Sequence, residues 1–184
     1  MDWEAFKERK LEQLAMAIEA GEVDRKILPL LNLINQKNGL VSSSSCSGRI
    51  LILKIKKSKK DAKKLLVWHR EISLGEFKSA LRVLGNKNLF WLRVEPFILH
   101  ILAKDIESAK KVLVAMKLAG IKRGGIVYIS KKITIEIMGH GQLIVPLYLL
   151  KNYKQTIKVI NSLMKKNTIK LKKFEKSLQA VFNS

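Results

Sequence analysis

The sequence predicts an α+β fold in a single domain, with a mixed β-sheet and helices packed against it. Some segments repeat apolar residues every three or four positions, as amphipathic helices do, and others hold dense or alternating apolar runs, as strands do. The chain has 184 residues and 47% apolar content, which suffices for one core and is short for two domains. We expect residues 1–150 to form the catalytic and RNA-binding body of the domain and residues 151–184 a basic helical extension packed on it.

The N-terminal part predicts two helices. Five apolar residues at helical spacing precede Gly21, which can end a helix, and they are Trp3, Phe6, Leu11, Leu14 and Ile18. Asp24 can cap a second helix that runs toward Gly39. Pro29 lacks a backbone donor, so we expect it to kink this helix or to delay its start.

Two strands and a helix are expected next. Dense Ile and Leu in residues 49–56 and 65–72 indicate strands joined by a Lys-rich connector. Ser73 and Glu76 have the spacing of a capping box, and Gly85 can end the helix that they begin.

Residues 89–103 predict one long strand, interrupted at Pro96, where the missing donor indicates an edge or a bulge. Asp105 can cap the following helix, and Gly120 can end it. Isoleucines then alternate with polar residues up to residue 138, which predicts a hairpin.

The C-terminal segment predicts one long helix or two helices joined near Asn167. From residue 150 onward the apolar positions step by threes and fours in a heptad pattern. Nine lysines and a single acid, Glu175, give the segment a basic outer face. We favour a helix packed on the sheet over a self-pairing coiled coil.

The charge balance points to a polyanionic partner. Thirty-six basic residues stand against 15 acidic ones, a net charge of +21, far more than solubility requires. Nucleic acid is favoured over an anionic membrane, because no segment resembles an amphipathic anchor. The apolar runs are too short to span a bilayer and the N-terminus does not resemble a signal peptide, so we expect a cytoplasmic protein.

A serine-rich segment, residues 42–49, is the first candidate binding site. Small hydroxyl residues beside glycine let backbone donors approach an anion or a base, and an arginine can clamp a carboxylate or phosphate. The candidates are Ser44, Ser45, Cys46, Gly48 and Arg49. A flexible linker is the alternative. Cys46 is the only cysteine, which excludes an internal disulfide, and a thiolate beside Arg49 could act as a nucleophile.

Four titratable residues are candidates for acid–base chemistry. His69, His100 and His140 lie at or near the ends of predicted strands, and a histidine can serve as a general base near neutral pH. Their spacing matches no metal motif, so we predict no metal site. Glu95 is a candidate base or the partner of an arginine in a buried ion pair. The absence of a G-x-G-x-x-G or P-loop motif disfavours a Rossmann methyltransferase and an NTPase.

Several of these segments, in this order, resemble the wybutosine-synthesising tRNA methyltransferases. The resemblance extends over roughly residues 1–150. The segments that carry it are residues 44–50, 65–69, 94–100, 124–126, 140–141 and 145–147.

The resemblance implies transfer of a methyl group from S-adenosylmethionine to ring nitrogen 4 of 7-aminocarboxypropyl-demethylwyosine, at position 37 of phenylalanine tRNA. Under this hypothesis His69 or Glu95 takes the proton and His100 orients the base. The implied binding residues are Ser44, Ser45, Cys46, Gly48, Arg49, Pro96, Phe97, Gly125 and His140. No obligate protein partner is inferred. The alternative function is a non-catalytic basic RNA-binding module.

Overall fold

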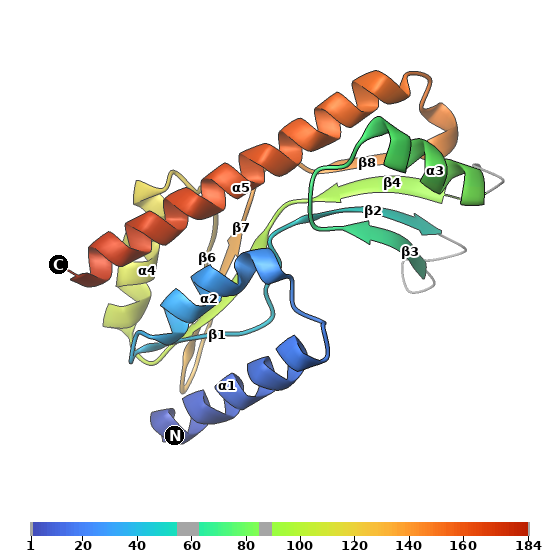
Figure 1. Ribbon diagram of the computed structural model, residues 1–184. Coiled ribbons are helices and arrows are strands. Elements are labelled where there is room, and N and C mark those ends of the chain that lie inside the picture. The colour runs from blue at the N-terminus through green and yellow to red at the C-terminus, as the bar shows by residue number, and fades with distance from the viewer. Residues whose placement is uncertain (1, 55–62, 85–89, 184) are drawn as a thin grey trace. The chain divides into compact units, whose positions relative to one another are not determined.

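The computed structural model describes residues 2–54, 63–84 and 90–183 (Figure 1). The helices are α1 (Trp3–Glu19), the 3₁₀ turn η1 (Arg25–Ile27), α2 (Leu28–Asn35), α3 (Leu74–Leu84), α4 (Ile106–Leu118), the 3₁₀ turn η4 (Leu147–Leu149) and α5 (Tyr153–Asn183). The strands are β1 (Leu40–Ser42), β2 (Arg49–Lys54), β3 (Lys63–Trp68), β4 (Phe90–Glu95), β5 (Ile98–Ala103), β6 (Arg123–Ile129), β7 (Ile133–Met138) and β8 (Leu143–Pro146).

The chain forms two compact units, each with its own sheet. The first unit comprises Met1–Ser47, Phe97–Gly139 and Ile169–Ser184, and the second comprises Gly48–Pro96 and His140–Thr168. The first sheet has the strand order β1-β5-β7-β6 and the second the order β3-β2-β4-β8. The α+β class is confirmed. The described strands pair antiparallel in two sheets, a correction to the single mixed sheet, because apolar periodicity does not specify which strands pair.

Both faces of the first unit's sheet carry packed side chains, although β6 is largely exposed. One face packs on α2, α4 and the end of α5, through side chains such as Leu40, Ile101 and Phe174. Alternate residues of the same strands, Val41 and Leu102, point to the other face, where they pack against Trp3 of α1. This alternation follows from the two-residue period of a strand.

Two long-range hydrogen bonds attach α1 to the body of the first unit. Trp3 Nε1 donates to the Asn38 carbonyl over 2.7 Å, and Lys7 Nζ donates to the Lys37 carbonyl over 2.7 Å. Burial lowers the pKa of Lys7 because an ammonium group loses hydration there. The carbonyl acceptor replaces part of that hydration.

The second unit has a core of its own. Ile50 and Ile52 of β2 pack with Phe77 of α3 and with Ile160 of α5. Asn161 of α5 makes two hydrogen bonds to one backbone residue, because its Oδ1 accepts from the Ile72 amide over 3.0 Å and its Nδ2 donates to the Ile72 carbonyl over 2.8 Å. The start of α3 is thereby fixed to α5.

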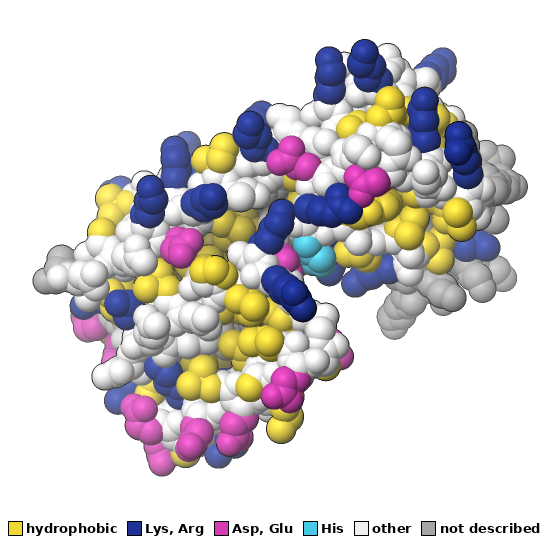
Figure 2. Space-filling model, viewed as in Figure 1, with side chains coloured by type: hydrophobic (Ala, Val, Ile, Leu, Met, Phe, Trp, Pro, Cys, Tyr) yellow, Lys and Arg dark blue, Asp and Glu magenta, His cyan; other side chains and the backbone are white. Residues whose placement is uncertain are grey.

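The C-terminal segment is one continuous helix, as the first of the two alternatives predicted. Its apolar side chains enter both cores: Met164 packs in the second unit and Leu178 in the first. The buried Asn167 lies beside the boundary between these two parts. Figure 2 shows dark blue basic side chains along α5, so the expected basic outer face is confirmed. None of the described helices combines the length and apolar character needed to cross a membrane.

Local signals account for most element boundaries. Asp24 caps η1, and α2 begins with Pro29 in its first turn, so the predicted delay is confirmed. The strand predicted at residues 89–103 is instead two strands, because Pro96 ends β4 and the chain enters the other sheet as β5. Two short strands were not predicted from the sequence: β1, which has three residues, and β8, which has four. Gly85 lies outside the described residues.

The predicted capping box of α3 is formed. Ser73 Oγ accepts a hydrogen bond from the Glu76 amide over 3.1 Å, and Glu76 Oε2 accepts one from the Ser73 amide over 2.8 Å. Arg70 donates to the other oxygen of Glu76 over 2.5 Å. These hydrogen bonds, the one from Arg70 first, lower the pKa of Glu76 from 4.5 to about 2.

We predict that Glu76→Gln reduces the acid sensitivity of the fold. A carboxyl whose pKa is depressed on folding stabilises the protein above its unfolded pKa, and this contribution disappears as the pH falls from about 4.5 toward 2. Thermal unfolding should therefore show a smaller loss of Tm over this range in Glu76→Gln than in the wild type. Glu71→Gln, at an exposed neighbouring position, should behave like the wild type. Parallel profiles for Glu76→Gln and the wild type would contradict the prediction.

Candidate functional site

The serine-rich segment of the first unit is held along β5. The Ser43 amide donates to the His100 carbonyl over 2.8 Å. Cys46 and Ile98 exchange two backbone hydrogen bonds of 2.9 and 3.0 Å. Between these points, Ser45 Oγ accepts from the His100 amide over 3.3 Å. These bonds fix the segment against the sheet, so it is not a flexible linker.

The His100 side chain links this segment to the sheet. Its Nδ1 lies 2.6 Å from the Ser44 carbonyl oxygen, and its Nε2 lies 3.0 Å from Glu136 Oε2 on the neighbouring strand β7. Both ring nitrogens therefore face acceptor oxygens. His100 thereby links the Ser44 carbonyl of the serine segment to Glu136 on β7.

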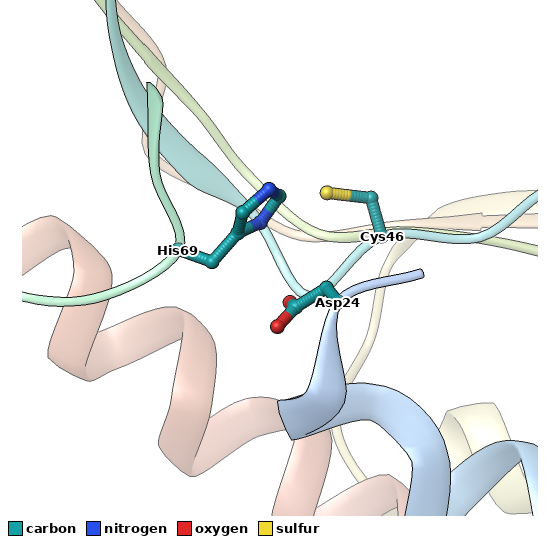
Figure 3. Close-up of side chains that lie close together, drawn as sticks. All are labelled: Asp24, Cys46 and His69. Carbon is teal, nitrogen blue, oxygen red and sulfur yellow. The ribbon is translucent and has the colours of Figure 1, made fainter. Parts of the chain in front are cut away.

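Asp24 holds the other end of the segment. One carboxylate oxygen accepts from the Lys26 amide over 3.0 Å, and the other accepts from Ser47 Oγ. Figure 3 shows Asp24 beside Cys46, and one ligand atom of each lies within 4.8 Å of the other. His69, also drawn there, belongs to the second unit.

A pocket of about 240 Å³ lies between the serine segment and the helical part of the first unit. Lys10 and Gln13 of α1, Glu22, and residues 42–45 contribute its polar lining, and Leu14 is among its apolar lining residues. Ser42 is 3% exposed, and its hydroxyl has no hydrogen-bond partner. Buried hydroxyls are normally paired, so the unpaired Ser42 hydroxyl is an exception.

An arginine–glutamate cluster lies in the second unit. Arg49 on β2 and Glu95 on β4 are direct cross-strand partners, and Arg49 Nε donates to Glu95 Oε2 over 2.6 Å. Arg93 Nε lies 3.1 Å from Glu95 Oε1 but lacks hydrogen-bond geometry. Both carboxylate oxygens thus face a guanidinium group. The ion pair that the sequence left open as a role for Glu95 is present.

His69 follows β3 in the same unit. Its Nδ1 lies 3.2 Å from the Gly48 carbonyl oxygen, and Gly48 has a φ of +95°, which favours glycine. Because a carbonyl oxygen only accepts, the Nδ1 atom must carry the proton in this contact.

Comparison with known proteins identifies the family. The family model described as Methyltransferase TYW3 matches residues 5–180. The chain belongs to the TYW3 methyltransferase family. The resemblance deduced from the sequence motifs is thereby confirmed, and the matched residues include every predicted site residue.

Relatives in the TYW3 family are similar over most of their length. A Pyrococcus abyssi protein, named tRNA(Phe) 7-((3-amino-3-carboxypropyl)-4-demethylwyosine(37)-N(4))-methyltransferase 1, is 34% identical and covers 97% of this chain and 96% of its own. A Methanocaldococcus jannaschii protein named for the same activity is 39% identical over 72% of this chain and 70% of its own.

Solved structures show the same fold. The PH1069 protein from Pyrococcus horikoshii superimposes with a TM-score of 0.86 and 33% identity, covering 96% of each chain. A hypothetical protein from Aeropyrum pernix gives a TM-score of 0.72 and 26% identity, covering 88% of this chain and 100% of that one.

The other predicted binding residues of this TYW3 family member lie in different parts of the fold. Gly125, at a φ of +155°, lies on the same rung of the first sheet as His100, with Glu136 between them. Phe97 is fully buried in the core of the first unit. Pro96 is partly exposed and His140 is exposed, both in the second unit.

Several polar residues that shape these sites were not predicted as site residues from the sequence. Glu136 carried a signal, because it is the only charged residue in a strand of alternating isoleucines. Arg93 alternates with buried residues along β4 in the same way. Asp24 was predicted only as a helix cap. Lys10 and Glu22 carried no signal, because charged residues near an N-terminal helix are commonly solvent-facing.

Proposed function

We propose that this protein methylates ring nitrogen 4 of 7-aminocarboxypropyl-demethylwyosine at position 37 of phenylalanine tRNA, in the synthesis of wybutosine derivatives. The observation that carries the proposal is the family match together with the Pyrococcus abyssi relative, whose name states this reaction. The fold shared with PH1069 supports it over nearly the whole chain. A tRNA substrate also implies a cytoplasmic location.

We propose S-adenosylmethionine as the methyl donor. It would supply an electrophilic methyl group on a sulfonium sulfur. The first unit offers a chemically suitable surface, because the serine segment combines hydroxyl groups with the unpaired Ser42 hydroxyl beside a partly apolar pocket. This pocket lies on the side of the serine segment that faces α1.

In this proposal Arg49 clamps a ligand carboxylate. Its Nε binds Glu95, and a guanidinium group has four further N–H donors. Glu95 is then a positioning residue, because its contacts with Arg49 and Arg93 fix the guanidinium plane. The negative charge of Glu95 also offsets the electrostatic repulsion between Arg49 and Arg93, which both lie beside it.

His69 is proposed as the general base. The accepting nitrogen must release a proton as the methyl group is transferred, and an imidazole side chain is suited to receive a proton near neutral pH. His100 is a less suitable base, because both of its ring nitrogens already face acceptor oxygens. We assign it to positioning the serine segment.

The deciding experiment uses tRNA from an archaeal strain that lacks the last methylation step. The purified protein is incubated with this tRNA and S-adenosylmethionine carrying a heavy methyl group, and the modified nucleoside is analysed by mass spectrometry. Transfer of one heavy methyl group is expected, with no transfer to an unmodified transcript. Tight tRNA binding without cofactor binding in calorimetry would instead establish the non-catalytic RNA-binding module.

We predict that tRNA affinity falls steeply with salt. Displacement of six to ten phosphate counterions would weaken binding by roughly 10³-fold or more between about 50 and 200 mM salt. Exposed lysines of α5 should carry part of this dependence, and suitable targets are Lys165, Lys166, Lys172 and Lys173. Replacing these four with Gln should flatten the logarithmic slope, whereas Arg at the same positions should preserve it. Equal slopes for the Gln variant and the wild type would remove α5 from the interface.

A further inference from the structure

We infer that the pocket between α1 and the serine segment binds a zwitterionic α-amino-acid group. This inference rests on the proposed function, in which the methyl donor and the substrate base each carry an aminocarboxypropyl chain. The pocket would receive the amino-acid end of one of them. Its lining residues all belong to the first unit.

Opposite charges line the pocket. Lys10 supplies an ammonium group and Glu22 a carboxylate, while Gln13 adds a neutral amide whose Oε1 accepts from Lys10 Nζ over 2.9 Å. An α-amino acid at neutral pH presents a carboxylate and an ammonium group on adjacent atoms. A pocket with one side chain of each sign complements that pair, and charge-assisted hydrogen bonds would hold both ends.

The Ser42 hydroxyl provides an independent indication of a ligand. It is buried without a hydrogen-bond partner, although the Ser42 amide is satisfied by Asn35 Oδ1 over 2.8 Å. An unpaired buried hydroxyl costs free energy of folding, and a polar ligand in the pocket that it lines would restore the missing bond.

Charge and size argue against an RNA phosphate or an entire nucleoside as the occupant. Seven of the 15 acidic residues lie within the first 24 positions, against three basic ones, so this part of an otherwise basic chain is acidic. Figure 2 shows acidic side chains in magenta along α1. The pocket volume of about 240 Å³ is below the range of roughly 300–1,000 Å³ usual for drug-sized ligands, which suits the amino-acid end alone.

The pocket also adjoins the segment fixed by His100. Ser44 and Ser45, which line the pocket, contact the ring and the amide of His100 respectively. A ligand held here by its amino-acid end would therefore be anchored beside residues of the proposed site. The remainder of such a ligand must extend out of the pocket.

Calorimetry with two probes tests the cofactor as the source. S-adenosylhomocysteine carries the amino-acid group and 5′-methylthioadenosine lacks it. We expect Lys10→Gln and Glu22→Gln to weaken S-adenosylhomocysteine binding roughly tenfold and to leave 5′-methylthioadenosine binding unchanged. Arg9→Gln and Glu19→Gln are matched controls, because both residues are exposed and lie outside the pocket lining.

A second arm tests the substrate as the source. If the pocket binds the substrate chain, Lys10→Gln and Glu22→Gln should bind S-adenosylhomocysteine as the wild type does. The wild type should prefer tRNA whose tricyclic base carries the aminocarboxypropyl chain to tRNA whose base lacks this chain. The two variants should lose this preference. Either result supports the pocket and assigns its occupant.

Ser42→Ala separates binding from folding. Because it removes a hydroxyl without a partner, we expect an unchanged or higher Tm together with weaker binding of the amino-acid probe. Pocket variants that match the wild type in both arms, with the wild type active, would overturn this inference alone. A wild-type protein that neither binds S-adenosylhomocysteine nor methylates the tRNA would overturn the proposed function and the inference with it.

Discussion

Arg49→Ala is expected to lower turnover by about 100-fold or more while the protein remains folded. A guanidinium that fixes a charged ligand group contributes on the scale of an oxyanion-hole donor, about 3 kcal/mol of transition-state stabilisation. Its contribution to folding should be small, on the order of 1 kcal/mol. The side chain is 27% exposed, and Glu95 keeps Arg93 as a neighbour after the substitution.

The measurement is methyl transfer under single-turnover conditions, together with thermal unfolding. Arg70→Ala is the matched control, because it breaks another arginine–glutamate pair in the second unit outside the proposed site. Arg49→Lys should restore little activity, since an ammonium group lacks the planar pair of donors. If Arg49→Ala loses Tm and activity together, and Arg49→Lys recovers both, the residue is structural.

The helices of this fold could be predicted because their signals are local. Asp105 caps α4 through a hydrogen bond to the Ser108 amide, three residues away, and Ser73 and Glu76 act over the same distance. Such bonds depend little on the rest of the chain. The heptad of α5 is likewise readable, because the same residues that repeat in sequence enter the cores.

Strand pairing could not be predicted in the same way. The Arg49–Glu95 pair joins residues 46 positions apart, and its presence depends on β4 lying beside β2. The composition of residues 89–103 gives no sign that its two halves enter different sheets. Only the register places Arg49 opposite Glu95 and His100 opposite Glu136.

The residues of the candidate site could therefore be predicted, but their arrangement in space could not. The serine segment, Arg49 and the histidines were identified from their chemistry. The partners that give these residues their roles, such as Glu136 and the Gly48 carbonyl, come from distant positions. The pocket lined by Lys10 and Glu22 required the docking of α1, which the sequence did not specify.

His69→Gln is expected to remove the pH dependence of methyl transfer on the acidic side of neutrality. If His69 takes the proton, wild-type turnover should rise with pH on the acidic side of neutrality and then level off. The reason is that only the neutral ring has an acceptor lone pair. Glutamine is similar in polarity to histidine and cannot serve as the base. His69→Gln should therefore bind cofactor and tRNA normally, with turnover reduced by about 100-fold or more and a flat profile.

The paired variant Glu95→Gln distinguishes the base from the residue that positions Arg49. Because both oxygens of Glu95 face arginines, its loss should weaken ligand binding through Arg49 and leave the rising limb of the pH profile in place. If Glu95 were the base, Glu95→Gln would instead bind the ligand normally, and the rising limb of its pH profile would be absent. If His69→Gln retains near-normal turnover with an unchanged profile while Glu95→Gln abolishes both, the proton goes to the carboxylate and the assignment to His69 is wrong.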